Sequence, residues 1–389
     1  MSYKRLFSRS INASPARLHA AAHSHHLWPD AAFEGHAEAA DDAARLADRK
    51  WDKVTDEIVP AARAEVAAEL NVGNGDTIAF APNTHEFVVR LRSCFPADKP
   101  VRILTTDGEF HSFSRQLARW EEAESVVATR VPVEPFDSFA DRILEAIAAE
   151  PFDWVFVSHV FFASGCVFDR LNDLAAALGD RPDCLVIDGY HGFMAIETDF
   201  APIASRAFYL AGGYKYAMSG EGVCFLHAPR GFCPRPENTG WFAAFDALEA
   251  EQDGRVGYAE TAARFAGATY DPSGLYRFLA VRRMLAAEGL TTARISAHVR
   301  PLLDQLAEEI AAGRAGHLAD AELLAVRGDG PAARFLAYRH PDAPEWTRRL
   351  AEAGIVTDAR GDVIRFGLGL YHDPEDVDRL VETCATACG

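Results

Sequence analysis

The 389-residue chain carries a formal net charge of −18, with 49% hydrophobic and 25% charged residues, which is an ordinary globular composition. Its length allows a large core divided between a large and a smaller domain. The acidic balance argues against nucleic acid or an anionic membrane as a partner, because each requires a basic face. It still allows a bound phosphate, which backbone N–H groups and hydroxyls can hold locally.

The seven cysteines are odd in number, dispersed and without a Cys-x-x-Cys pair. This pattern argues against a disulfide framework or a zinc site and favours a reducing compartment. The N-terminus lacks the apolar core of a signal peptide. The most apolar stretch, residues 154–168, is interrupted by Ser158 and Gly165 and is too short to span a bilayer. We therefore expect a cytoplasmic protein with neither a membrane partner nor a bound metal.

Short apolar runs alternate with helical stretches over roughly residues 60–240. Residues 30–70 come first and predict helix, because Ala39, Ala43 and Leu46 repeat at helical spacing. Strands are predicted at residues 77–80, 101–105, 154–158, 184–187, 208–211 and 222–226. This alternation predicts a doubly wound α/β domain, whose mostly parallel sheet is covered by helices on both faces. Ligands of such sheets bind beyond the carboxyl ends of the strands.

The pattern changes after about residue 285 and predicts a small α+β domain. The expected order is helix 295–312, strands 323–326 and 334–338, helix 346–353, strand 362–366 and helix 374–384. We divide the chain into an N-terminal segment with a helix near the small domain (1–60), a large α/β domain (61–284) and the small C-terminal domain (285–389).

Two strand ends carry residues that point to chemistry. Asp188 follows the apolar run 184–187, where an aspartate would most often cap the next helix or turn. Lys215 follows the run 208–211 and a glycine pair; a lone lysine there is normally solvated, but its neighbours are aromatic. Together they suit pyridoxal phosphate, since the lysine forms an imine and the carboxylate keeps the pyridine nitrogen protonated. Burial would also lower the lysine pKa and make the amine a better nucleophile.

Three motifs occur in one order along the chain. Ser-His-Val at 158–160 precedes Asp188 and His191, and these precede Gly-Tyr-Lys-Tyr at 213–216 with Ser-Gly-Glu-Gly at 219–222. In their order and spacing the motifs resemble those of fold-type I pyridoxal phosphate enzymes of the class V aminotransferase superfamily, most of all kynureninase. The resemblance runs from about residue 18 to residue 383. It implies a PLP-dependent enzyme with a large α/β domain, a small C-terminal α+β domain and a Lys215 Schiff base.

The resemblance also implies which residues hold the cofactor. Asn83 and Thr84 match the residues that cradle the phosphate, which suits a helix N-terminus, although a plain N-cap is the simpler interpretation of Asn83. Phe110 matches the residue that stacks on the ring, with His111 as the competing candidate and a core aromatic as the alternative. Ser112, His191 and Tyr214 complete the expected cofactor contacts.

Three further positions rest on the resemblance alone. Trp241 is similar to a tryptophan that reaches the phosphate or the substrate, and Thr269 to a loop residue that crosses from a second subunit to the phosphate, although Tyr270 replaces the usual proline. Arg365 is similar to the arginine that clamps the substrate α-carboxylate, a role that suits its planar fork; an edge-strand surface arginine is the alternative. A homodimer is therefore expected.

The reaction stays open at this level. Kynureninase-like hydrolysis of an aryl-keto amino acid is the first hypothesis, although Phe113 stands where kynureninases carry an aspartate after Ser112. A class V aminotransferase comes next, followed by a β-lyase or cysteine desulfurase and by a catalytically silent PLP-binding homologue. No loop cysteine is evident as a desulfurase nucleophile. The cluster of His23, His25 and His26 is expected to line the mouth of the active site rather than to hold a metal.

Overall fold

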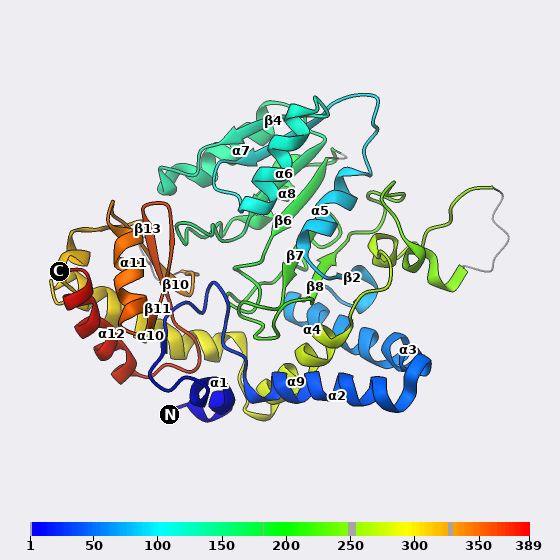
Figure 1. Ribbon diagram of the computed structural model, residues 1–389. Helices are drawn as coiled ribbons and strands as arrows, with labels where there is room; N and C mark the ends of the chain where they lie inside the picture. The colour runs from blue at the N-terminus through cyan, green and yellow to red at the C-terminus, as the bar shows by residue number, and fades with distance from the viewer. Residues whose placement is uncertain (1, 182, 248–253, 326–329) are drawn as a thin grey trace.

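The structure is a computed structural model that describes residues 2–181, 183–247, 254–325 and 330–389 (Figure 1). A seven-stranded sheet forms its centre, with the strand order β2-β8-β7-β6-β5-β3-β4. Its strands are β2 (Ile78–Ala81), β3 (Val101–Thr106), β4 (Val126–Val131), β5 (Trp154–Ser158), β6 (Cys184–Asp188), β7 (Ala207–Gly212) and β8 (Cys224–His227). Only β8 runs antiparallel to its neighbours β2 and β7, so the sheet is mostly parallel, as predicted.

The two faces of this sheet are both buried, because its central strands are apolar at nearly every position. Alternate residues belong to different hydrophobic clusters: Val155 and Val157 pack into one, and Trp154 and Phe156 into the other. Helices α5 (Thr84–Arg92) and α6 (His111–Glu122) supply the second cluster, while α7 (Phe139–Ala149) and α8 (Leu171–Leu178) supply the first. The predicted coverage of both faces is confirmed.

The predicted helix over residues 30–70 is broken in the structure. It divides into α2 (Asp30–Leu46), α3 (Lys50–Lys53), a π-helical turn (Val54–Ile58) and α4 (Val59–Leu70). The break follows α2, where Ala47 adopts a positive φ of 48°. Helix α2 packs along α9 (Ser273–Ala287), and Gly35 permits this approach, because a Cβ there would lie 2.6 Å from Tyr276 O.

The C-terminal part contains an antiparallel four-stranded sheet in the order β12-β13-β10-β9. Its elements are α10 (Thr292–Ala311), β9 (Glu322–Leu323), β10 (Phe335–Arg339), α11 (Ala343–Glu352), β11 (Ile355–Val356), β12 (Asp358–Arg360), β13 (Val363–Gly367) and α12 (Pro374–Ala387). The N-terminal segment, with α1 (Ser8–Asn12), joins it through β1 (Leu18–His19), which pairs with β11 in parallel. The division into three domains remains a prediction.

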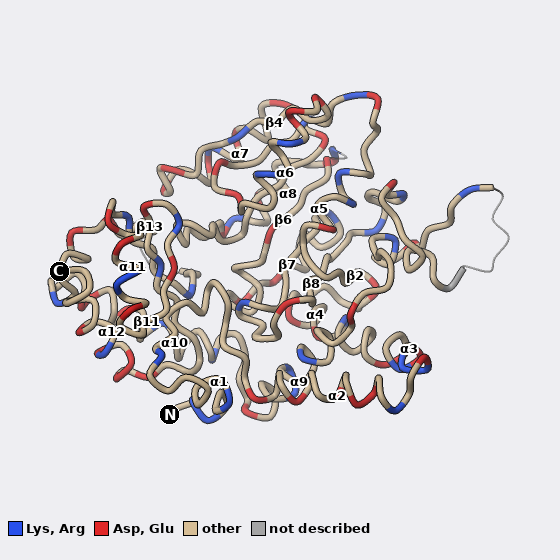
Figure 2. The backbone as a smooth tube through the Cα atoms, in the orientation of Figure 1, with Lys and Arg blue, Asp and Glu red and all other residues tan. Residues whose placement is uncertain are grey.

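Short 3-10 helices connect these elements. They span Lys4–Phe7, Ala47–Arg49, Gly75–Thr77, Phe136–Ser138, Trp241–Ala247, Ala262–Phe265 and Gly316–Asp320. Acidic residues outnumber basic ones on outer helices such as α2 and α12 (Figure 2). Among the described residues, no helix is long and apolar enough to cross a membrane.

The predicted strands of the central sheet are all present, with ends that differ by one or two residues. Strand β4 was not predicted, because it is an edge strand whose middle residues are largely exposed and lack an apolar run. Strand β9 is shorter than the predicted strand 323–326, of which residue 326 lies outside the described residues.

Candidate active site

A cavity of about 420 Å³ lies beyond the carboxyl ends of the central strands. Ser158 ends β5, Asp188 ends β6 directly beside it in register, and Lys215 follows the end of β7 by three residues. The cavity is lined by Pro82, Asn83, Thr84, His85, Phe110, Ser112, Ser158, Val160, Phe162, Asp188, Tyr190, His191, Tyr214, Lys215, Glu221, Gly222 and Cys224. The structure thus brings together eight of the expected site residues, all except Trp241, Thr269 and Arg365.

Lys215 is buried in an aromatic surrounding. Its Nζ lies 4.7 Å from the ring centre of Tyr190, 5.6 Å from that of Phe110 and 5.7 Å from that of Tyr214. Only 5% of the residue is exposed, and no described residue forms a hydrogen bond or an ion pair with its amine. Burial lowers the pKa of this amine to about 7, although the charge of Asp188 acts in the opposite direction. A buried amine without a polar partner is unfavourable, so binding of a polar or covalent partner in the cavity would stabilise it.

Asp188 is similarly under-satisfied. Its Oδ1 accepts a hydrogen bond from Tyr190 N at 3.0 Å, and no described residue donates to its Oδ2. Burial raises the pKa of this carboxyl, while the Tyr190 amide and the charge of Lys215 oppose that change. A cationic N–H group at this strand end would supply the missing donor and restore the ionised form. The carboxylate and the amine therefore line one cavity, and each has capacity for a further polar partner.

Helix α5 points its N-terminus at the same cavity. Asn83 is its N-cap, with Oδ1 accepting from Glu86 N at 3.0 Å, so the simple capping role is present. Thr84 begins the helix and lines the cavity next to Asn83. The unpaired N–H groups and the positive end of the helix dipole favour an anion there, which fits a phosphate.

Aromatic side chains form a further wall. Phe110 lines the cavity and meets Phe162 edge to face, with ring centres 5.2 Å apart. His111 also contacts Phe162 but does not line the cavity, so of the two candidates only Phe110 is placed at the cavity; the ring-stacking role itself stays a prediction. Ser112, in the first turn of α6, opens onto the same space.

Glu109, a buried carboxyl that the sequence analysis did not single out, contacts the cavity-lining Ser158. Glu109 accepts hydrogen bonds from Ser158 Oγ at 2.6 Å, from Thr106 Oγ1 at 2.8 Å and from Ser158 N at 3.1 Å. Burial raises the pKa of Glu109 to about 8, with the nearby Asp188 adding to the increase. Its only signal in the sequence is a charged residue just after the apolar strand that ends at Thr106.

His191 lies in the cavity wall as expected and is 5% exposed. Its Nδ1 is buried without a partner among the described residues. Burial and the charge of Lys215 lower the pKa of His191 well below its usual value, so it is a neutral imidazole. A neutral imidazole can accept or donate one hydrogen bond to a bound molecule.

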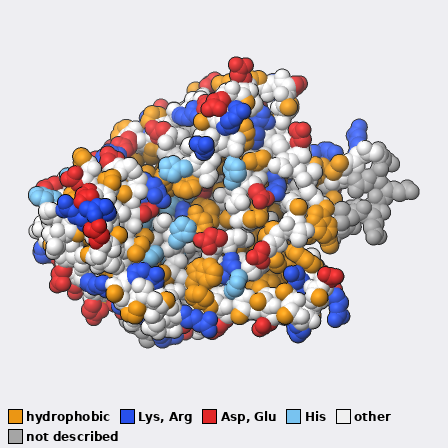
Figure 3. Space-filling model, in the orientation of Figure 1, with side chains coloured by type: hydrophobic (Ala, Val, Ile, Leu, Met, Phe, Trp, Pro, Cys, Tyr) orange, Lys and Arg blue, Asp and Glu red, His pale blue; other side chains and the backbone are white. Residues whose placement is uncertain are grey.

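The N-terminal loop covers one side of this region. His25 stacks on Tyr214 with ring centres 4.7 Å apart, and His26 N donates to Tyr214 O at 2.9 Å. His23 instead contacts Asp358 and Phe335. No cluster suited to a metal ion occurs among the described residues. Histidine and hydrophobic side chains gather near the middle of the face in Figure 3, among scattered charges.

Trp241 and Thr269 lie elsewhere in this chain. Trp241 is 45% exposed and stacks on Phe242, which lines a second cavity of about 280 Å³. Tyr270, which follows the exposed Thr269, lines the same second cavity. Neither residue lines the Lys215 cavity, so a contact with cofactor through them would require a second subunit.

Arg365 also falls short of the cavity surface. It is 2% exposed, and its Nε donates to Asp358 Oδ1 at 2.9 Å while Nη2 donates to Asp358 Oδ2. Its Nη1 donates to the carbonyl of Phe162, a cavity-lining residue. The alternative of a surface arginine is wrong, because the side chain is buried. The role of Arg365 as a clamp for the substrate carboxylate stays a prediction, and one edge of its guanidinium already binds the carboxylate of Asp358.

Neither a protein-family model nor a curated protein matches this chain. Solved structures do match. The cystine C–S lyase C-DES, in complex with its product cysteine persulfide, has a TM-score of 0.78 at 18% identity, over 97% of this chain and 99% of that one. The same lyase is known as a variant with glycine covalently linked to its PLP cofactor.

Two cysteine desulfurases are similar over their full length. That of Thermococcus onnurineus NA1 has a TM-score of 0.76 at 17% identity, over 99% of both chains. CsdA of Escherichia coli has a TM-score of 0.77 at 16% identity, over 98% of this chain and 97% of that one. The chain therefore has the α/β fold of fold-type I PLP enzymes such as cysteine desulfurases, which confirms the predicted fold class.

Proposed function

We propose that this protein is a pyridoxal phosphate-dependent enzyme that acts on an α-amino acid. The observation that carries the proposal is the buried amine of Lys215, which has no polar partner among the described residues and shares one cavity with Asp188 and the N-terminus of α5. Each of these three features fits one part of the cofactor: the aldehyde, the ring nitrogen and the phosphate. When bound, pyridoxal phosphate supplies a ring that accepts electrons from the substrate Cα.

The chain's own residues have separable roles in this proposal. Lys215 holds the cofactor covalently and, when its amine is free, can carry a proton at its Nζ at neutral pH, because burial lowers the pKa of the free amine to about 7. Asp188 holds the proton of the ring nitrogen, and Asn83 and Thr84 hold the phosphate at the start of α5. Phe110 limits the tilt of the ring, and Ser112, His191 and Tyr214 bound the remaining space. Arg365 binds the substrate carboxylate through the N–H groups that Asp358 leaves.

We further propose that the reaction breaks a bond to the substrate Cβ. Kynureninase-like hydrolysis of a Cβ–Cγ bond is the form that the sequence motifs favour. Cleavage of a Cβ–S bond is the second candidate, and its support is that the structurally similar proteins are a cystine C–S lyase and cysteine desulfurases. Transamination is the remaining alternative.

Within the second candidate, a lyase is favoured over a desulfurase that stores sulfur on its own thiol. Among the residues that the structure describes, Cys224 is the only cysteine in the cavity wall, and it lies in strand β8 rather than in a loop. Burial raises the pKa of Cys224 to about 12, so it is a thiol and a poor nucleophile at neutral pH.

Two further parts of the proposal concern the protein's state. We infer a homodimer, in which the exposed aromatic side chains around Trp241 and Phe245, 45% and 41% exposed, face a second copy together with Thr269. A cytoplasmic location suits the seven cysteines, all of which are free.

A substrate screen tests the proposed function. The purified protein, loaded with pyridoxal phosphate, is mixed with L-kynurenine, L-cystine, L-cysteine and common amino acids, while the absorbance of the cofactor is followed and products are identified by mass spectrometry. Alanine with an aromatic acid would support hydrolysis, pyruvate with a sulfur product would support lysis, and a keto acid with the aminated cofactor would indicate transamination. A protein that binds no cofactor, or whose cofactor responds to none of these compounds, contradicts the proposal.

A further inference from the structure

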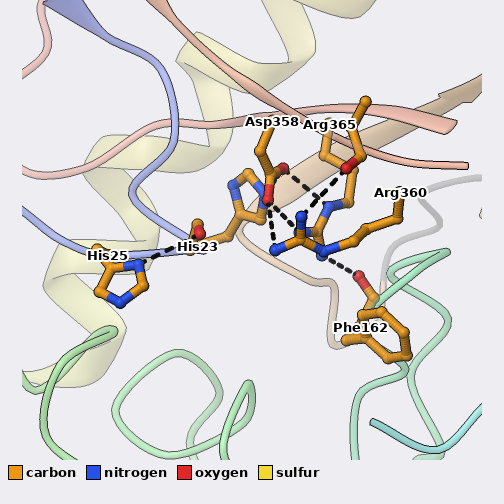
Figure 4. A network of polar contacts seen from close by, with 8 residues as sticks. His23, His25, Phe162, Asp358, Arg360 and Arg365 are labelled. Carbon is orange, nitrogen blue, oxygen red and sulfur yellow. Dashed lines mark hydrogen bonds and ion pairs between the residues drawn. The ribbon is translucent and has the colours of Figure 1, made fainter. Parts of the chain in front are cut away.

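The charged side chains of Asp358, Arg360 and Arg365 form a cluster next to Phe162 (Figure 4), which lines the cavity. Strands β12 and β13 form a hairpin in which Asp358 stands directly opposite Arg365. Arg360 lies two residues from Asp358 on β12 and therefore on the same face of the hairpin. The carboxylate and both guanidinium groups thus come from one rigid element.

Asp358 is shared among three partners. Besides Arg365, it contacts Arg360 Nη2 at 3.3 Å and accepts from His23 Nε2 at 2.9 Å. Burial lowers the pKa of His23 to about 4, so at neutral pH this ring donates as a neutral imidazole. Burial acts to raise the pKa of Asp358, but the hydrogen bonds and charges of His23 and Arg365 hold it far below its usual value. One carboxylate therefore faces two guanidinium groups, and the cluster keeps one net positive charge.

Hydrogen bonds to Asp358 and Phe162 fix the guanidinium of Arg365. It has five N–H donors, and Asp358 takes those of Nε and one of Nη2, while Phe162 O takes one of Nη1. Among the described residues, one N–H on Nη1 and one on Nη2 remain. Guanidinium N–H groups are donors that a carboxylate accepts, in bidentate fashion where two of them lie side by side.

Arg365 lies next to the wall of the cavity that holds the reactive amine. Arg365 Nη1 is bonded to the backbone of Phe162, whose side chain lines the cavity. The charges of Arg365, Asp358 and Arg360 all act on the pKa of Lys215, which places the cluster within electrostatic range of the amine. A carboxylate on Arg365 would therefore sit close to a substrate amine held at Lys215.

We propose that Asp358 is the positioning residue for the substrate carboxylate, fixing the plane of Arg365, and that Arg360 offsets its charge so that the site stays cationic. The proposal rests on the proposed function, because it needs an amino acid at Lys215. A carboxylate that instead competed with substrate for Arg365 would have the opposite effect when removed, so the two roles can be distinguished by experiment.

The test compares L-alanine with ethylamine, which lacks only the carboxylate, on the PLP-loaded protein. Dissociation constants are read from cofactor absorbance for the wild type and for Asp358→Asn. Because Asp358→Asn no longer fixes the plane of the Arg365 guanidinium, the dissociation constant of L-alanine should rise by about ten-fold, while that of ethylamine changes by less than about two-fold. Arg360→Gln should weaken L-alanine by a smaller factor of about three. Asp362→Asn, an exposed position on the same hairpin, is the matched control and should change neither constant.

Thermal unfolding verifies that each variant is folded. If Asp358→Asn does not fold, Arg360→Gln still tests the proposal. Equal or tighter binding of L-alanine by Asp358→Asn overturns the positioning role, as does equal weakening of both probes. If the wild type itself binds neither probe, the proposed function fails and this inference fails with it. If the wild type responds and Asp358→Asn matches it, only the inference fails.

Discussion

Replacing Lys215 by methionine isolates the energetic cost of keeping an amine in the cavity. Methionine has a similar length but no charge, and it packs against aromatic rings such as those of Tyr190 and Phe110. In the protein stripped of any cofactor, the wild-type amine has no described polar partner and is 5% exposed. We therefore expect the Lys215→Met variant to be more stable than the wild type, although it cannot attach a cofactor.

The size and sign of this effect follow from the pKa. Burial lowers the pKa of Lys215 from 10.5 to about 7. At about 1.4 kcal/mol per pKa unit, the charged amine destabilises the cofactor-free protein by roughly 5 kcal/mol below pH 7. Relaxation and water in the cavity reduce this, and we expect a gain of about 2 kcal/mol for the variant at pH 6. Between pH 7 and 10.5 the unfolded wild-type chain binds more protons than the folded one, so the free energy of unfolding of the wild type rises with pH. The stability difference between the variant and the wild type therefore falls by about half at pH 9.

Urea denaturation of both cofactor-free proteins at pH 6 and pH 9, followed by circular dichroism, measures this difference. A matched Lys99→Met variant, changed at an exposed loop lysine, provides the control and should show no pH-dependent gain. A Lys215→Met protein that is less stable than the wild type at pH 6, or a gap that does not depend on pH, would refute the account of a buried, under-satisfied amine.

Three other predictions address separate parts of the site. Asp188→Ala should lower turnover by about a hundred-fold and cofactor affinity by less, because the charge-assisted contact acts on the reacting ring; unchanged turnover would remove that role. Arg365→Lys keeps the charge but loses the fork, so amino-acid substrates should weaken by about ten- to a hundred-fold, on the order of one to three kcal/mol, with cofactor binding unchanged in titrations. Light scattering should find a dimer at assay concentration, whereas an active monomer would contradict the inferred contribution of Thr269.

The parts of the fold that could be predicted are those whose residues are buried on both faces. Strands β5, β6 and β7 are continuous apolar runs, and the rule that ligands bind beyond the carboxyl ends of parallel strands placed Asp188 and Lys215 in one site. Strand β4 was missed because an exposed edge strand has no such run. The break after α2 was missed because alanine-rich sequence continues through Ala47. The positive φ of Ala47 cannot be inferred from the spacing of apolar residues.

The missed site residues owe their place to tertiary contacts. The role of Glu109 depends on its hydrogen bond with Ser158, which is distant in the sequence. The role of Asp358 depends on its contact with Arg365 across a hairpin. Periodicity and motif spacing carry no information on such pairs. Trp241 and Thr269 came from the family resemblance rather than from physical reasoning, and in a single chain they lie by another cavity.

The most direct test of the central claim is reduction of the PLP-loaded protein with borohydride, followed by digestion and mass spectrometry. The account predicts one pyridoxyl-modified peptide per chain, with the modification at Lys215, and no adduct in the Lys215→Ala protein, which should remain folded. An adduct at another lysine, or no adduct at saturating pyridoxal phosphate, would contradict it.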